Sequence, residues 1–272
     1  MANSNGWGDG AGNNAIGWGQ AANNAINWGK SQIDSWAGVT DITGIPSTDA
    51  DAQAFITAAS ITDPTQQAAI NTLVVDLKGY SIWTKMKALY PFCGSASSHK
   101  FNLKDPRDLD AAFRLVFSGG WTHSSTGALP NGTNAYADTK FNSSTNATLN
   151  SHSLSYYSRT NSNGSEIEIG NWNGSTPYNF LEIRTSGITY FLINQNSTAT
   201  TYSDSNSQGF YLGNRTASNV INGWKNSSKV VNSSVASSSL LNFNIFLGAV
   251  SSSNLPLYYT TKQCAFASIG DG

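Results

Sequence analysis

Charge is the scarcest property of this 272-residue chain, because Asp, Glu, Lys and Arg make up 11% of it. Ordinary soluble domains carry roughly a quarter. The 15 basic and 16 acidic residues leave a formal net charge of -1. Phosphate binding depends on clustered basic residues, so we expect no nucleic-acid partner. No apolar run approaches the roughly 20 residues of a membrane span, so we also expect no membrane insertion.

Cysteine is nearly as rare, since Cys93 and Cys264 are the only two in the sequence. Two cysteines cannot form the dense disulfide framework of small secreted domains. A signal peptide begins with a basic segment followed by an apolar one, and we find no such pattern in this sequence. We predict two unbonded thiols in a reducing cytoplasm, with one long-range disulfide as the alternative.

The polarity of the chain comes from uncharged side chains instead. The sequence holds 38 Ser, 30 Asn and 25 Gly, together with an 11% share of aromatic residues. This composition is typical of extracellular β-structure and adhesive surfaces.

A ten-residue repeat organises the N-terminal segment. Asn13–Gly19 reads NNAIGWG, and Asn23–Gly29 repeats it as NNAINWG. Gly and Asn favour turns over helix. An extended segment of this kind has no core of its own in which to bury its Trp and Ile residues. We predict an extended assembly or anchoring segment over residues 1–46, with a disordered low-complexity tail as the alternative. The residues assigned to this anchor are Trp7, Asn14, Ile16, Trp18, Asn24, Ile26, Trp28 and Trp36.

Residues 47–95 change to a helical pattern. Thr48 and Asp51 indicate one helix start, and Asp63-Pro64 indicates a stronger one. An apolar face at i, i+3, i+4 and i+7 follows the second start and ends near Gly79. We expect a third short helix over residues 81–89, and the three helices together would form a small collar.

Residues 96–272 have the pattern of a β-protein, with short apolar runs separated by Gly, Asn, Ser and Pro. We therefore predict a mostly β fold, in which an antiparallel β-sandwich follows the collar and the N-terminal repeat. The expected strands are Leu154–Arg159, Glu166–Ile169, Tyr178–Arg184, Ile188–Ile193, Phe210–Gly213, Val220–Trp224, Phe243–Leu247 and Cys264–Ile269.

Several segments resemble a family of virion proteins from tailed phages of Bacteroidetes-type bacteria, including crAss-like phages. These segments are Leu89–Phe92, His99–Arg114, Gly120–Gly132 and Ala267–Gly272. The strand–turn–strand pattern of Val220–Val231 is similar to LamG-like, concanavalin-type jelly rolls, and the N-terminal repeat resembles segments that open phage fibres and spikes.

The resemblance implies a structural virion protein, made in the host cytoplasm and released by lysis. It would be a head or tail fibre or spike, anchored to a capsid or tail protein through its N-terminus. The unburied Trp and Ile residues of the repeat and the small helical collar predict that it is a homotrimer. Its jelly roll would bind a host-surface glycan, without enzymatic activity or a cofactor. A capsid decoration protein without a ligand is a further alternative.

Glu166 and Glu168 suggest another alternative, a polysaccharide-degrading spike. Alternate residues of a strand share a face, so the two carboxylates would lie close enough to act as a pair. The interpretation that we prefer is two solvent-facing carboxylates alternating with buried Ile167 and Ile169. The spacing of the three His residues indicates no metal site.

Aromatic residues next to Asn and Gly are the better candidates for a binding site, because aromatic faces stack on sugar rings. The assigned ligand-binding residues are Trp121, Trp172, Asn173, Tyr178 and Trp224. Ordinary packing within the sandwich or between subunits is the alternative for each aromatic side chain.

Overall fold

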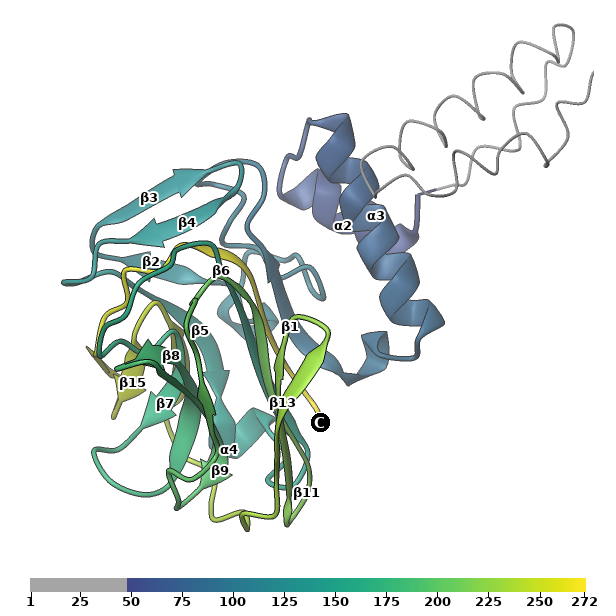
Figure 1. Cartoon of the computed structure of the whole chain (residues 1–272). Helices are drawn as coiled ribbons and strands as arrows, with labels where there is room; N and C mark the ends of the chain where they lie inside the picture. Colours follow the sequence, from purple (N-terminus) through teal and green to yellow (C-terminus); the bar gives the residue numbers. More distant parts are fainter. Residues whose placement is uncertain (1–47) are drawn as a thin grey trace, which may run out of the picture. The chain divides into compact units, whose positions relative to one another are not determined.

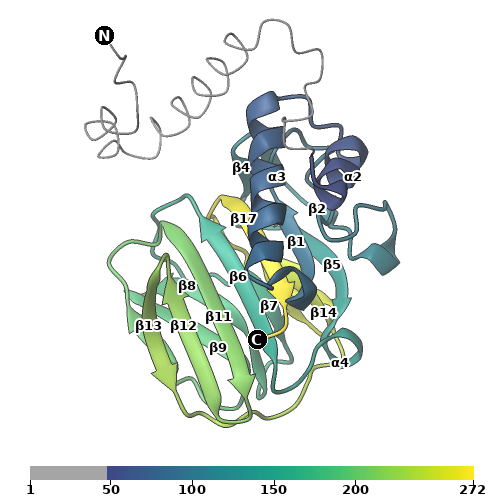
Figure 2. The ribbon, with the colours of Figure 1, turned by 90° about the vertical axis from the view of Figure 1, so that its right-hand side faces the viewer.

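The structure, a computed structural model, describes residues 48–272. The anchor predictions for Trp7, Asn14, Ile16, Trp18, Asn24, Ile26, Trp28 and Trp36 lie outside the described residues. Two antiparallel sheets face each other, and two helices cover one end of the first sheet (Figures 1 and 2). The predicted mostly β fold, a sandwich preceded by helices, is thus confirmed.

Helices α2 (Ala50–Ala58) and α3 (Pro64–Gly79) begin at capping aspartates. The carboxylate of Asp63 accepts the Gln66 N–H at 2.8 Å, which confirms the predicted start of α3. For α2 the cap is Asp49 rather than Thr48, and it accepts the Asp51 N–H at 2.9 Å. The helices bury Phe55, Ile56, Ile70 and Val74 against Leu89 and Phe266 of the sandwich.

The predicted third helix is wrong. Only the 3-10 turn η2 (Trp83–Lys85) forms, and β1 (Met86–Pro91) follows it and pairs antiparallel with β17 (Cys264–Gly270). A short apolar run suits a helix or a doubly buried strand equally well, so its periodicity does not decide between them. Here Leu89 faces the helices, whereas Ala88 and Tyr90 face the main core. The sandwich thus takes a strand from inside the range predicted for the collar.

The first sheet has the strand order β13-β12-β11-β6-β17-β4-β3, with β1 also paired to β17. Its other strands are β3 (Trp121–Ser124), β4 (Gly127–Pro130), β6 (His152–Ser158), β11 (Gly209–Ala217), β12 (Val220–Lys225) and β13 (Ser228–Ser233). The predicted strands beginning at 154, 210, 220 and 264 are confirmed as members of this sheet.

The second sheet has the order β10-β9-β8-β7-β14-β5-β2, and β15 and β16 extend it beside β7. Its strands are β2 (Val116–Ser118), β5 (Tyr136–Asn142), β7 (Ile169–Trp172), β8 (Tyr178–Thr185), β9 (Ile188–Gln195), β10 (Thr201–Ser203), β14 (Asn244–Leu247), β15 (Val250–Ser252) and β16 (Leu255–Leu257). The short helical turns η3 (Asp110–Ala112) and α4 (Ser143–Asn146) lie in its connections.

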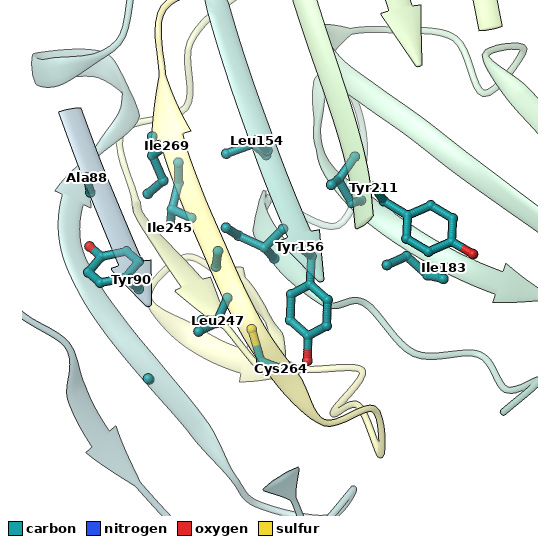
Figure 3. Close-up of a cluster of buried hydrophobic side chains, with 14 of the residues drawn as sticks. Ala88, Tyr90, Leu154, Tyr156, Ile183, Tyr211, Ile245, Leu247, Cys264 and Ile269 are labelled. Carbon is teal, nitrogen blue, oxygen red and sulfur yellow. The ribbon is translucent and has the colours of Figure 1, made fainter. Parts of the chain in front are cut away.

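The main core fills the space between the sheets with side chains from both, as Figure 3 shows around Tyr156, Tyr211 and Leu247. The hydroxyl groups of its buried tyrosines all have acceptors; that of Tyr156, for example, donates to the Lys262 carbonyl at 2.6 Å. Cys93 and Cys264 are free thiols, and Cys264 is fully buried. No helix within residues 48–272 is long and apolar enough to cross a membrane.

Candidate functional site

A small apolar cluster of Ile167, Phe180, Leu192 and Val250 lies on the outer face of the second sheet, away from the main core. Because side chains alternate along a strand, Leu181 and Ile183 of β8 point into the main core while Phe180 points outward. In β9, likewise, Phe191 points into the main core and Leu192 points outward. Ser186 and Gly187, both at positive φ, form the tight turn that joins these two strands.

One glycine of β7 makes room for the floor of this cluster. Gly170 pairs with Phe180 and has a φ of 145°. A Cβ atom at Gly170 would lie 2.4 Å from the Phe180 Cβ and 2.3 Å from the Asn179 carbonyl oxygen. Any side chain at this position would therefore clash with the backbone of β8 and with the base of the Phe180 side chain.

Aromatic side chains stand on that floor and line a pocket of about 290 Å³. Trp172 and Tyr178, which pair across β7 and β8, stack with ring centroids 6.2 Å apart and an interplanar angle of 27°. The ring centroid of Tyr258 lies 5.9 Å from that of Trp172, and Tyr190 of β9 also lines the pocket. Tyr258 is 44% exposed, so the pocket presents an aromatic edge to solvent.

Local backbone contacts hold two of these rings in place. The Trp172 indole N–H donates to the Ser175 carbonyl, and the Asn173 side chain accepts the Ser175 N–H at 3.0 Å. Asn173 thus shapes the turn that carries Trp172. The Tyr258 backbone lies in the left-handed region at φ 54°, and its carbonyl accepts the Ile167 N–H at 2.9 Å.

Three polar side chains interrupt the apolar lining, namely Glu182, Ser165 and Thr198. Glu182 lies opposite Tyr190 in the strand register and is half-buried. Burial raises the pKa of Glu182, although a hydrogen bond from Thr185 and the charge of Lys262 oppose this shift. Apolar walls with a few convergent polar groups are typical of ligand pockets.

The structure brings together Trp172, Asn173 and Tyr178 of the predicted ligand-binding residues, but it places Trp121 and Trp224 elsewhere. The Trp121 indole N–H donates to the carbonyls of Ser118 and Tyr136, and its ring packs on the main core. Trp224 lies on the first sheet between Leu212 and Lys229, whose ammonium lies 5.5 Å from the ring centroid.

Glu166 and Glu168 do not face solvent, so that part of the preferred interpretation is wrong. Both carboxylates bind the ammonium of Lys262, at 3.0 and 3.1 Å respectively, and the Lys262 and Glu168 side chains are 0% exposed. The Thr260 hydroxyl lies 2.9 Å from Glu168, which also accepts the Ile183 N–H. We call Glu166, Glu168 and Lys262 the buried acid cluster.

The three members of the buried acid cluster have different pKa shifts. Burial raises the pKa of Glu168 to about 7, although Lys262 opposes the shift. For Glu166, burial is outweighed by the Thr261 N–H and by Lys262, so its pKa falls below the usual value. For Lys262, burial favours the neutral amine, but the two carboxylates outweigh it and the pKa of Lys262 rises.

The histidines form no metal site with other ligands within residues 48–272. The Nδ1 atoms of His99 and His123 lie 2.9 Å apart, and the first of these rings is fully buried. Burial lowers the pKa of His99 to about 4, and it has the same effect on His152.

Sequence reasoning missed Glu182, Tyr190 and Tyr258 as members of the pocket. The alternation in β8 and β9 contained a usable signal, because it places Glu182 and Tyr190 on the same side as Phe180 and Leu192. Tyr258 had no such signal. It follows β16 and reaches the pocket only through the pairing of β15 with β7.

Fold and site together define an antiparallel β-sandwich with an aromatic pocket on one outer face. No family model and no curated protein matches the chain. Among solved structures, the chain is similar to domain 4 of AbnA, a GH43 extracellular arabinanase from Geobacillus stearothermophilus solved with arabinotriose. The identity is 13% and the TM-score 0.37, with 69% of this chain and 93% of that domain covered.

It is also similar to a variant of the NanB sialidase from Streptococcus pneumoniae, at 14% identity and a TM-score of 0.37. That match covers 56% of this chain and 25% of the sialidase, so the chain spans about a quarter of that protein.

Proposed function

We propose that residues 48–272 form a non-catalytic carbohydrate-binding domain, and that the aromatic pocket is its binding site. The observation that carries this proposal is that Trp172, Tyr178, Tyr190 and Tyr258 line one pocket together with the half-buried Glu182. Flat aromatic faces suit the C–H faces of a sugar ring, and scattered polar groups satisfy its hydroxyls.

The other two glutamates, Glu166 and Glu168, are paired with Lys262, and this supports a binding role over hydrolysis. A retaining or inverting glycosidase needs two carboxyl groups that flank the same bond and exchange protons with it. Glu166 and Glu168 are both bound to Lys262, and the carboxylate of Glu168 is fully buried, so it cannot reach a polysaccharide. Among the residues that line the pocket, Glu182 is the single acid.

Replacement of one pocket tryptophan tests the proposal. The protein would first be screened against immobilised glycans, and the best ligand measured by titration calorimetry. Trp172→Ala should weaken its binding at least tenfold, which corresponds to about 1.4 kcal/mol. Trp224→Ala is the matched control, because it removes the same side chain from the other sheet and should leave affinity unchanged.

Equal losses in both variants, or a loss in Trp224→Ala alone, would show that the pocket is not the site. A mutation of Glu166 that abolished release of reducing sugar from host capsular polysaccharide would support the alternative, a polysaccharide-degrading spike.

We also propose, from the sequence resemblance, that the domain is displayed on a phage particle as a homotrimeric head or tail fibre or spike. Its N-terminal repeat would bind a capsid or tail protein, because buried aromatic side chains often dominate an interface. Trp18→Ala with Trp28→Ala should lower the copy number on purified virions, measured by quantitative mass spectrometry. An unchanged copy number would exclude the repeat as the anchor, and light scattering of the free protein tests the trimer.

A further inference from the structure

Glu182 is the one charged side chain among the residues that line the aromatic pocket. Its Oε1 atom accepts a hydrogen bond from the Thr185 hydroxyl at 2.5 Å. Its Oε2 atom has no hydrogen-bond partner within residues 48–272. Glu182 lies opposite Tyr190 in the strand register, and one of its carboxylate oxygens is therefore available to accept a hydrogen bond from a ligand.

Lys262, whose charge acts on Glu182, is held by two other carboxylates. Lys262 is close enough to lower the pKa of Glu182, but its ammonium lies 3.0 and 3.1 Å from Glu166 and Glu168. The buried lysine is thus paired with two other carboxyl groups and forms no salt bridge with Glu182 within residues 48–272. No Lys or Arg lines the pocket, so this wall presents an acceptor and a negative charge, and nothing in the lining would pair with an anion.

We infer that Glu182 determines specificity: the pocket takes sugars that turn a hydroxyl or an ammonium group toward it, and it rejects uronic and other carboxylated sugars. This inference rests on the proposed function and adds the class of ligand. A hydroxyl or ammonium donor would complete the coordination of Oε2, whereas a sugar carboxylate would face a like charge in a half-buried setting. Unfavourable pairing of this kind is an effective source of discrimination.

Three linear trisaccharides of matched length separate these possibilities, one of glucosamine, one of glucose and one of galacturonic acid. Their affinities for the full chain would be measured by titration calorimetry at neutral pH and low salt. The wild-type protein should bind the glucosamine and glucose trimers at least tenfold more tightly than the galacturonate trimer.

Glu182→Gln keeps the shape of the side chain and one acceptor oxygen but removes the charge. The ratio of glucosamine to galacturonate affinity should fall at least tenfold in this variant, while the glucose trimer changes less than threefold. Asp76→Asn on the exposed side of α3 is the matched control, because it removes the same net charge away from the pocket. Its affinity ratios should equal those of the wild type.

An unchanged ratio in Glu182→Gln, with binding still lost in Trp172→Ala, would overturn the specificity inference and leave the proposed function intact. Tighter binding of the galacturonate trimer than of the other two by the wild type would also overturn it. Failure of the wild type to bind any sugar, both in the glycan screen and in calorimetry, would overturn the inference together with the proposed function.

Discussion

The three glutamates of the chain lie in two regions, the buried acid cluster and the aromatic pocket. Their burial and their contacts differ between these regions. Glu168 is 0% exposed and bound by Lys262, Thr260 and the Ile183 N–H. Glu182, in β8, is half-buried, and one of its carboxylate oxygens has no hydrogen-bond partner within residues 48–272. Burial raises the pKa of both. A raised pKa alone therefore does not identify a site, and the contacts of each carboxylate show which one is available to a ligand.

This contrast predicts that stability depends on the buried acid cluster while binding depends on the pocket. The substitutions below test that division, in order of decreasing effect on the free energy of unfolding.

Lys262→Met should have the largest effect, lowering the free energy of unfolding by about 3–5 kcal/mol at pH 8. It would leave two carboxylates without their cation, and an uncompensated buried charge is strongly destabilising. Urea denaturation measures the change. Lys87→Met is the matched control, because Lys87 pairs with Asp271 at the surface and should contribute under about 1 kcal/mol. Equal losses in the two variants would contradict a stabilising cluster.

The pH dependence of stability should differ between the wild type and Glu168→Gln by roughly 3 kcal/mol across the range from pH 4.5 to 8. The pKa of Glu168 is about 7 in the folded protein, against an ordinary value of 4.5. The folded state therefore binds the extra proton more tightly, and this contribution to stability is lost as the pH rises through 7.

The comparison with Glu168→Gln is needed because the buried histidines act in the opposite direction. Burial lowers the pKa of both His99 and His152 to about 4, so their contribution to stability is lost as the pH falls. Urea denaturation at both ends of the range gives the difference between the two proteins. A constant difference would show that Glu168 does not titrate between these values.

Trp172→Ala should cost less stability, about 2 kcal/mol, since the half-buried indole contributes less than a core side chain would. Thermal unfolding followed by circular dichroism would measure it. A complete loss of the folded state would mean that this ring belongs to the structural core, and that its effect on binding says nothing about the pocket.

Glu182→Gln should have the smallest effect, within about 0.5 kcal/mol, because a glutamine can still accept the Thr185 hydrogen bond. A marked loss of stability in urea would indicate that Glu182 is a structural residue, like Glu168, and would remove the contrast between the two regions.

Local sequence signals predicted the elements whose formation depends on neighbouring residues. Asp63 followed by Pro64 predicted the start of α3, and short apolar runs between Gly, Asn, Ser and Pro predicted β6, β8 and β9. The turn between Trp172 and Tyr178 indicated aromatic residues at a loop, and the register of β7 and β8 places those two rings against each other.

The sequence by itself therefore determined the β-sandwich class, the capped helices and two of the pocket aromatics. Only the tertiary structure decided that residues 86–91 form a strand, since the partner that makes β1 a strand is β17, far along the chain. The tertiary structure also decided that Lys262 forms salt bridges with Glu166 and Glu168, and that Tyr258 lines the pocket. The physical reason is the same in each case: pairing and burial arise between residues distant in sequence, whereas propensity and periodicity report only on neighbours.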